Sequence, residues 1–209
     1  MLAGLCEGSG MRALLLGVIF GLFFAGPAFA DFLHCGLKQQ AALIEAVKGA
    51  QLALDIAEVS IGPDNEHFET WFGPFSAKRG EFVRDRLSDI RVEMEVENLD
   101  FYCAKNGEQS CERGSYANVS PDAPFLIYIC PDYFELPELA NVVDIESEEY
   151  GTRDGALVHE MTHFDVLAAT EDGCYGRSQC AFFAESQPRR AYDNADAYEY
   201  FVEDNAFGR

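Results

Sequence analysis

Beyond residue 30, apolar positions recur at helical spacing in two stretches. The first predicts a long helix from about Leu37 to Ile56, which is broken at Gly62-Pro63. The second predicts a helix that begins near Ser76, because a serine hydroxyl is well suited to cap a first turn. The apolar residues of this second helix fall on one face: Val83, Leu87, Ile90 and Met94.

The middle of the chain has the composition of strands. Short segments separated by Gly, Asn and Pro predict strands at Leu99 to Cys103, Tyr116 to Val119 and Phe125 to Cys130. Helical patterning returns near Thr152, and a last helix is expected from about Ala191 to Asn205. Helices beside a small antiparallel sheet predict an α+β fold, mainly helical, in a single domain.

The first 30 residues have the pattern of a secretory signal peptide. Arg12 precedes an apolar run from Ala13 to Ala25, and Ala28-Phe29-Ala30 supplies the small residues that a signal peptidase requires. We therefore expect residues 1–30 to be removed, leaving residues 31–209 as the domain of a secreted protein, extracellular or periplasmic. An uncleaved membrane anchor is the alternative, but the apolar run is too short for a span.

Charge and cysteine content narrow the function classes further. A net charge of −21 predicts a surface that repels nucleic acid and attracts basic partners, although the same charge can simply confer solubility. Once Cys6 leaves with the signal, an even number of cysteines remains, which suggests three disulfides in an exported chain. Spacing alone does not choose among the possible pairings. The six cysteines are Cys35, Cys103, Cys111, Cys130, Cys174 and Cys180.

The segment His159-Glu160-Met161-Thr162-His163 carries the clearest chemical signal. Two histidines four apart on a helix project from one face, so both imidazoles can bind one Zn²⁺. Glu160 lies one step round the helix and is better placed to take a proton from water than to bind the metal. The chain has four histidines, and two of them fall in this arrangement, which favours a zinc peptidase over a chance pattern.

A catalytic zinc normally takes three protein ligands and leaves one position open. The layout HExxHxxGxxH is excluded, because Val166 and Ala169 stand where its glycine and third histidine would be. Glu185 is a well-spaced candidate for the third ligand, whereas Asp165 lies too close on the same helix. The turn that follows the helix can instead bring Asp172 back over it.

At this turn the chain resembles a known family. HExxH followed by Thr-x-Asp-x-x-Tyr-Gly, here Thr170 to Gly176, is similar to the aspzincins, which comprise the deuterolysins and the peptidyl-Lys metalloendopeptidases. The likeness covers most of residues 35–205. It implies a zincin-like domain in which one zinc per chain is bound by His159, His163 and Asp172, with Glu160 as the general base.

The resemblance implies further roles. Tyr175 matches the family tyrosine that stabilises the oxyanion, a task suited to a phenol hydroxyl. Ala169 departs from the usual family glycine, which puts the backbone angles of this loop in question. The cysteine positions imply disulfides that join Cys35 to Cys103, Cys111 to Cys130, and Cys174 to Cys180.

Asp196 and Glu199 lie three apart on the last predicted helix and share a face, so their charges favour a cation between them. The segment from Asn194 to Phe201 is similar to that of the peptidyl-Lys metalloendopeptidases. The resemblance implies a pocket there for the lysine side chain just after the cleaved bond. A solvated acidic helix face is the alternative interpretation.

The sequence therefore predicts a secreted, monomeric zinc endopeptidase that acts on lysine-rich proteins or peptides, away from membranes and nucleic acid. No serine or cysteine is arranged as a nucleophile. One alternative is a secreted, zinc-stabilised acidic module that captures basic proteins without cleaving them. Glu160 argues against it, because a structural zinc site has no use for a base beside the metal. A disulfide-stabilised interaction protein with an accidental HEMTH is the remaining alternative.

Overall fold

The computed structural model describes residues 30–108, 111 and 114–207, so the predicted signal peptide lies outside the described residues except for Ala30. The strands are β1 (Phe32–Leu33), β2 (Asp100–Cys103), β3 (Ala117–Val119) and β4 (Leu126–Ile129). The α-helices are α1 (Leu37–Ser60), α2 (Glu66–Phe72), α3 (Ala77–Glu93), α4 (Arg153–His163), α5 (Arg177–Ser186), α6 (Pro188–Ala191) and α7 (Ala195–Ala206). Short 3-10 helices are η1 (Val96–Asn98), η2 (Pro131–Glu135), η3 (Leu139–Asn141) and η4 (Ile145–Ser147).

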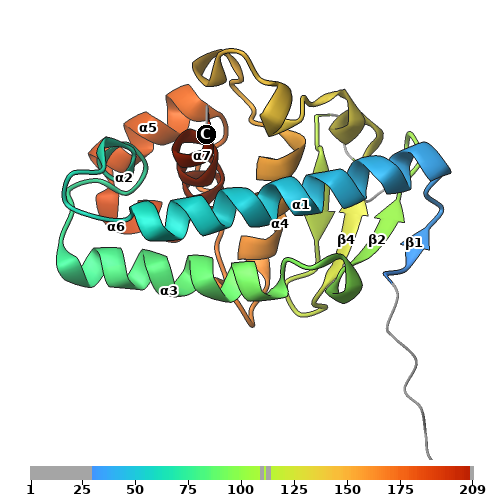
Figure 1. The fold of residues 1–209 in the computed structure, drawn as a ribbon, viewed down its shortest axis with the longest axis horizontal. Coiled ribbons are helices and arrows are strands. Elements are labelled where there is room, and N and C mark those ends of the chain that lie inside the picture. Colours follow the sequence, from blue (N-terminus) through green and yellow to red (C-terminus); the bar gives the residue numbers. More distant parts are fainter. Residues whose placement is uncertain (1–29, 109–110, 112–113, 208–209) are drawn as a thin grey trace, which may run out of the picture.

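Helix α1 is the centre of the fold. It crosses the whole molecule, with α3 beneath it, the sheet at one end and α2, α5 and α6 at the other (Figure 1). It packs against α3, α4 and α7. Its buried positions recur at helical spacing and are mostly small, which lets neighbouring helices approach closely: Leu43, Ala46, Val47, Ala50, Ala53, Leu54 and Ala57.

A glycine brings α1 and α4 together. Gly49 of α1 faces the carboxylate of Asp154 on α4, and a methyl group at position 49 would overlap that carboxylate. Asp154 Oδ2 in turn accepts a hydrogen bond from the backbone N–H of Leu139 at 3.0 Å. A glycine inside a helix usually costs about 0.5–1 kcal/mol relative to alanine. Here it makes room for a buried polar contact at the base of α4.

The predicted starts of two helices, near Ser76 and Thr152, are confirmed by the capping hydrogen bonds of these residues. Ser76 accepts a hydrogen bond from the N–H of Arg79 at 3.4 Å, and Thr152 accepts one from the N–H of Gly155 at 3.0 Å. The prediction that the last helix begins near Ala191 is wrong, because α7 begins at Ala195. Asn194 precedes it with an extended backbone, and its side chain accepts hydrogen bonds from the loop at residues 173–174.

The mainly helical α+β architecture is confirmed, but the sheet is mixed rather than antiparallel. Its strand order is β1-β2-β4-β3, with β1, β2 and β4 parallel and only β3 antiparallel to β4. Parallel pairing requires a long crossover connection, and the segment from α1 to η1, between β1 and β2, provides one. The sequence patterning had indicated strands without indicating which of them are neighbours.

Three disulfides have the pairing that the family resemblance implied. Cys35–Cys103 joins the start of α1 to β2, Cys111–Cys130 holds the loop before β3 against the end of β4, and Cys174–Cys180 closes a short loop at the start of α5. Disulfides of this kind fit an oxidising compartment.

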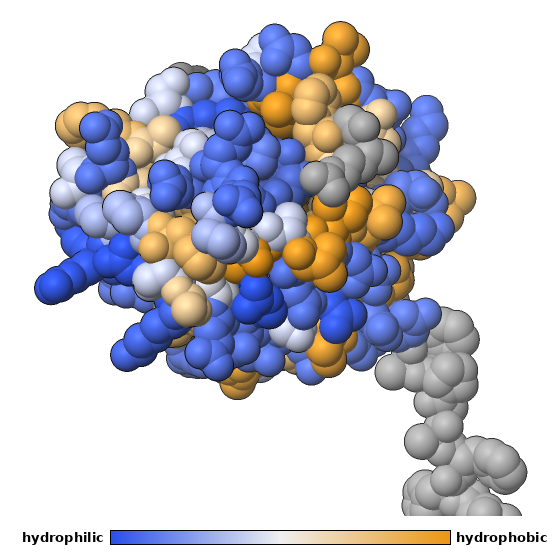
Figure 2. Space-filling view, turned by 60° about the vertical axis from the view of Figure 1, so that its left-hand side comes forward, coloured by the Kyte–Doolittle hydropathy of each residue, from blue (hydrophilic) through white to orange (hydrophobic). Residues whose placement is uncertain are grey.

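The face drawn in Figure 2 is predominantly hydrophilic, and its larger apolar patches lie mainly in the right-hand half of the view. Within the described part of the chain, no helix combines the length and the apolar character that a membrane span requires.

Candidate metal centre

The centre is built on the last turns of α4. Nearly every residue of this helix is buried, which fixes its orientation in the core. His159 and His163 lie one turn apart on its inner face, and their ring centroids are 4.9 Å apart. Glu160 lies between them in sequence and lines the same cavity.

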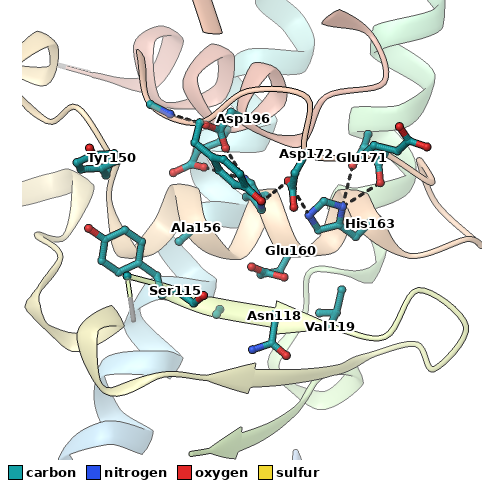
Figure 3. A pocket seen from close by; sticks show the side chains of 18 of the residues that line it. Ser115, Asn118, Val119, Tyr150, Ala156, Glu160, His163, Glu171, Asp172 and Asp196 are labelled. Atoms are coloured by element: carbon teal, nitrogen blue, oxygen red, sulfur yellow. Dashed lines mark hydrogen bonds and ion pairs between the residues drawn. The ribbon is translucent and has the colours of Figure 1, made fainter. Parts of the chain in front are cut away.

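The chain after α4 turns back over the helix. The N–H of Thr170 donates to the carbonyl of Thr162 at 3.1 Å, and the two threonine hydroxyls are 2.6 Å apart. This return places Oδ1 of Asp172 3.3 Å from Nε2 of His159 and 3.3 Å from Nε2 of His163. The three side chains predicted as ligands therefore converge on one point, as Figure 3 shows for Asp172 and His163.

The opposite nitrogen of each ring has its own partner. Nδ1 of His163 lies 2.9 Å from the carbonyl of Thr170. Nδ1 of His159 lies 2.7 Å from Asp196 Oδ1 and 3.2 Å from Glu199 Oε2. A proton on each Nδ1 satisfies these acceptors and leaves both Nε2 atoms directed at Asp172. That tautomer is the one required of histidines that bind a metal through Nε2.

The histidines and carboxylates of the centre strongly shift each other's pKa values. Burial alone would lower the pKa of His159, but hydrogen bonds to Asp172, Asp196 and Glu199 outweigh it and raise the pKa well above its usual value. Burial would raise the pKa of Asp172, but hydrogen bonds from both histidines outweigh it and hold this pKa far below the usual range. The cluster thus favours positive charge between the rings. Two imidazole nitrogens and one carboxylate oxygen fit zinc.

Two further groups face the same point. Burial raises the pKa of Glu160, and the neighbouring histidines only partly offset that rise. Tyr175 is 56% exposed at the cavity rim. Partial burial and a hydrogen bond to Asp172 raise the pKa of its phenol, so it keeps its proton. The disulfide Cys174–Cys180 and a 2.8 Å hydrogen bond from the N–H of Gly176 to Asp196 hold this loop in place.

The centre lies in a cavity of about 620 Å³. Residues 114–119, which include the edge strand β3, form the wall opposite α4; in Figure 3 Asn118 and Val119 lie across the cavity from Glu160. Among the described residues, the lining contains no lysine or arginine but several carboxylates: Glu160, Glu171, Asp172, Asp196 and Glu199.

Comparison with known proteins identifies the family. The aspzincin profile, described as "Lysine-specific metallo-endopeptidase", matches residues 58–203. The chain belongs to the aspzincin family. A zinc peptidase structure from Grifola frondosa superposes with a TM-score of 0.68 at 26% identity, covering 82% of this chain and 98% of that one.

Curated relatives agree with this assignment. The chain is 30% identical to a peptidyl-Lys metalloendopeptidase of Pleurotus ostreatus, covering 84% of this chain and 98% of the relative. It is 32% identical to an extracellular protease of Aeromonas hydrophila over 68% of this chain, but it spans only 36% of that protein. Family membership brings a zinc cofactor with it, and the donor set described above fits that ion.

The structure brings together every residue that the sequence assigned to the centre. Their individual roles stay predictions. The surroundings of Asp196 differ from those expected of a substrate-binding residue. It contacts His159 directly, and both of its carboxylate oxygens have partners within the protein. Asp196 is therefore less available to a substrate than the sequence suggested. Neither Glu185 nor Asp165 lines the cavity.

Sequence reasoning missed a buried network behind the centre. Arg177 donates to Glu203 Oε2 at 2.5 Å and to Asp204 Oδ1 at 2.6 Å, and its guanidinium lies 4.6 Å from the Tyr200 ring centroid. Glu203 Oε1 also accepts from the N–H of Thr152 at 2.7 Å. No spacing rule connects these residues, because they come from α5, α7 and the start of α4.

We predict that Asp196→Ala lowers zinc affinity by about 10–100-fold, because Nδ1 of His159 loses the closer of its two carboxylate acceptors and keeps only Glu199. Competition with a chromophoric chelator measures this affinity directly. Asp165→Ala is the matched control, since Asp165 is an exposed aspartate just beyond the helix that does not line the cavity. Equal zinc affinities of the two variants would contradict the proposal that Asp196 orients His159.

The loop also contains a strained alanine. Ala169 has φ 49°, in the left-handed region that costs a non-glycine residue about 1–2 kcal/mol. We predict that Ala169→Gly raises the free energy of unfolding by about 1 kcal/mol in denaturant titrations. The neighbouring substitution Ala168→Gly, at a buried alanine, should lower it instead. A destabilised Ala169→Gly variant would contradict the assigned strain.

Proposed function

We propose that this chain is a secreted zinc endopeptidase that binds one zinc and prefers a lysine just after the scissile bond. The observation that supports it best is the convergence of His159, His163 and Asp172 beside the buried Glu160, inside an open cavity. The names of the relatives support the same activity. The Aeromonas relative is named as extracellular, and the disulfides fit export.

His159, His163 and Asp172 would hold the zinc. When bound, the ion would polarise the substrate carbonyl and lower the pKa of a water molecule. Asp196 and the carbonyl of Thr170 keep the two rings aimed at the ion through their Nδ1 atoms.

Glu160 is the proposed general base. It takes the proton of the attacking water and passes it to the leaving amine, so one carboxylate serves both halves of the reaction. Glu160 is only 6% exposed, and burial raises the pKa of its carboxyl group. A raised pKa makes the carboxylate a stronger base near neutral pH than a solvated glutamate would be.

Tyr175 is the proposed oxyanion donor. Its raised pKa keeps the phenol protonated across the working range of pH, so it can donate to charge that develops on the carbonyl oxygen. The adjacent loop is held by Cys174–Cys180, which limits the distance over which the phenol can move. The substrate main chain would lie extended along the edge strand β3, which forms the facing wall.

The lysine preference is assigned to the end of the cavity beside α7. Glu199 is 4% exposed and lines the cavity, and its Oε1 has no hydrogen-bond partner among the described residues. Burial, reinforced by the nearby Glu203 and Asp196, raises the pKa of Glu199 to about 8. An ammonium group that enters this end of the cavity would pair with the Glu199 carboxylate and favour its ionised form. A neutral side chain would leave the carboxylate without that partner, which is the basis for selectivity.

We predict that Glu160→Gln lowers kcat by about 10³-fold or more while zinc content stays at one per chain, because the amide cannot accept the proton. Turnover of a lysine-containing peptide and elemental analysis of the same sample check both halves of the statement. Retained turnover would remove the general-base assignment. If the variant loses zinc together with activity, Glu160 is needed to maintain the metal site rather than to act as the base.

We predict that Glu199→Gln reduces the preference for lysine over a neutral residue after the scissile bond by at least about 10-fold in kcat/KM. Paired peptides that differ at that one position provide the measurement. Glu171→Gln is the matched control, since Glu171 is an exposed carboxylate that lines the same cavity. If both variants keep the wild-type preference, the pocket beside α7 does not select lysine.

A further inference from the structure

The chain contains few bonds that a lysine-directed peptidase could cut. Its sequence has four lysines against eleven arginines. The bonds that precede these lysines are Leu37–Lys38, Val47–Lys48, Ala77–Lys78 and Ala104–Lys105. A protease binds its substrate extended, so a bond held in regular structure must first open. The placement of these four bonds therefore decides whether the folded protein is a substrate of its own proposed activity.

The bond before Lys48 is the most deeply held. It lies in the interior of α1, directly after Ala46 and Val47, both fully buried in the core. The Lys48 ammonium is 2.9 Å from Glu45 on the same helix. Extending the chain here would require α1 to leave α4 and α7, which amounts to unfolding the domain.

The bond before Lys38 is in the first turn of α1, where fraying would normally begin. Here the preceding chain is fixed: Cys35 is bonded to Cys103, and β1 is paired with β2. The side chain of Gln39 accepts from the N–H of Gly36 at 2.8 Å, which closes the first turn.

The bond before Lys78 is in the first turn of α3 and is held in a comparable way. Ser76 caps that turn through both its side chain and its carbonyl. Arg79 Nη1 donates to the carbonyl of Pro74 at 2.8 Å, and Phe75 packs on Phe68 with ring centroids 5.1 Å apart. The residues on both sides of the bond are therefore anchored.

The bond before Lys105 is the one outside a helix. It follows β2 directly, and β2 lies between β1 and β4 in the sheet. Ala104 is 6% exposed, and its N–H donates to the carbonyl of Ile129 at 2.9 Å. The carbonyl of Lys105 accepts from the N–H of Glu108 at 3.1 Å, which closes a turn. The strand cannot enter a cleft without leaving the centre of the sheet.

We infer that this fold protects the chain from self-digestion: every lysine follows a bond held in a helix or at the end of a central strand, so self-cleavage proceeds only through opened molecules. Arginine, which forms the partly buried ion pairs to Glu138, Glu203 and Asp204, supplies cations there without creating cleavable bonds. The inference rests on the proposed lysine-directed activity.

The test uses the Glu160→Gln variant as a substrate for a catalytic amount of the wild-type enzyme. Isotope-labelled variant is supplied either folded or reduced, alkylated and unfolded, and its fragments are identified by mass. The unfolded copy should be cut before Lys38, Lys48, Lys78 and Lys105. The folded copy should be cut at least about 100-fold more slowly at each bond.

A second variant tests whether backbone structure is the protecting factor. Val143 is 93% exposed in an irregular segment between η3 and η4. Val143→Lys in the Glu160→Gln background should be cut before position 143 in the folded state, with the four native bonds intact.

The outcomes separate the two proposals. An unfolded copy that resists cleavage contradicts the proposed lysine-directed function itself. If the unfolded copy is cut, comparable cleavage of the folded copy overturns the protection inference. Resistance of folded Val143→Lys under the same conditions also overturns it, because an exposed irregular segment would then be no better a substrate than a helix.

Discussion

The packing of α7 against α4 is the contact on which the rest of the site depends. α7 buries three carboxylates at spacings of three and four residues, so they share one face: Asp196, Glu199 and Glu203. A buried carboxylate is costly without partners. Asp196 is satisfied by His159, and Glu203 by Thr152 and Arg177. Pairing these charges therefore fixes where α4 begins and how its first histidine is turned.

Glycines make this close packing of helices possible. A Cβ at Gly151 would overlap Glu199, and one at Gly155 would overlap Glu203. The two glycines let the carboxylates of α7 reach the backbone at the start of α4. Gly49 performs the same task between α1 and α4, where it accommodates Asp154. Polar groups in this core are thus placed by close backbone approach, and the cavity that exposes the centre lies at the edge of the same contact.

Local patterns predicted only part of this architecture. The first helix was predicted from about Leu37 to Ile56, and α1 ends at Ser60; for α3 and α4 the predicted starts near Ser76 and Thr152 are confirmed by their caps. Helices α2 and α6 were missed because they are short, and α5 because its first turn lies within the loop closed by Cys174–Cys180. β1 is two residues long and exists through its pairing with β2, so no period was available to detect it. The order and polarity of the sheet depend on crossover connections that strand patterning does not encode.

The sequence by itself determined which donor side chains meet in the centre, because HEMTH spacing is a local helical property and the Thr-x-Asp-x-x-Tyr-Gly turn follows closely after it in the chain. It also determined the disulfide content and the acidic charge. Only the tertiary structure decided that Asp196 and Glu199 face Nδ1 of His159 while Glu203 pairs with Thr152 and Arg177. That distinction depends on which atoms face His159 across a helix interface, between residues nearly forty positions apart in the chain, and side-chain contacts at that range follow from packing rather than from sequence period.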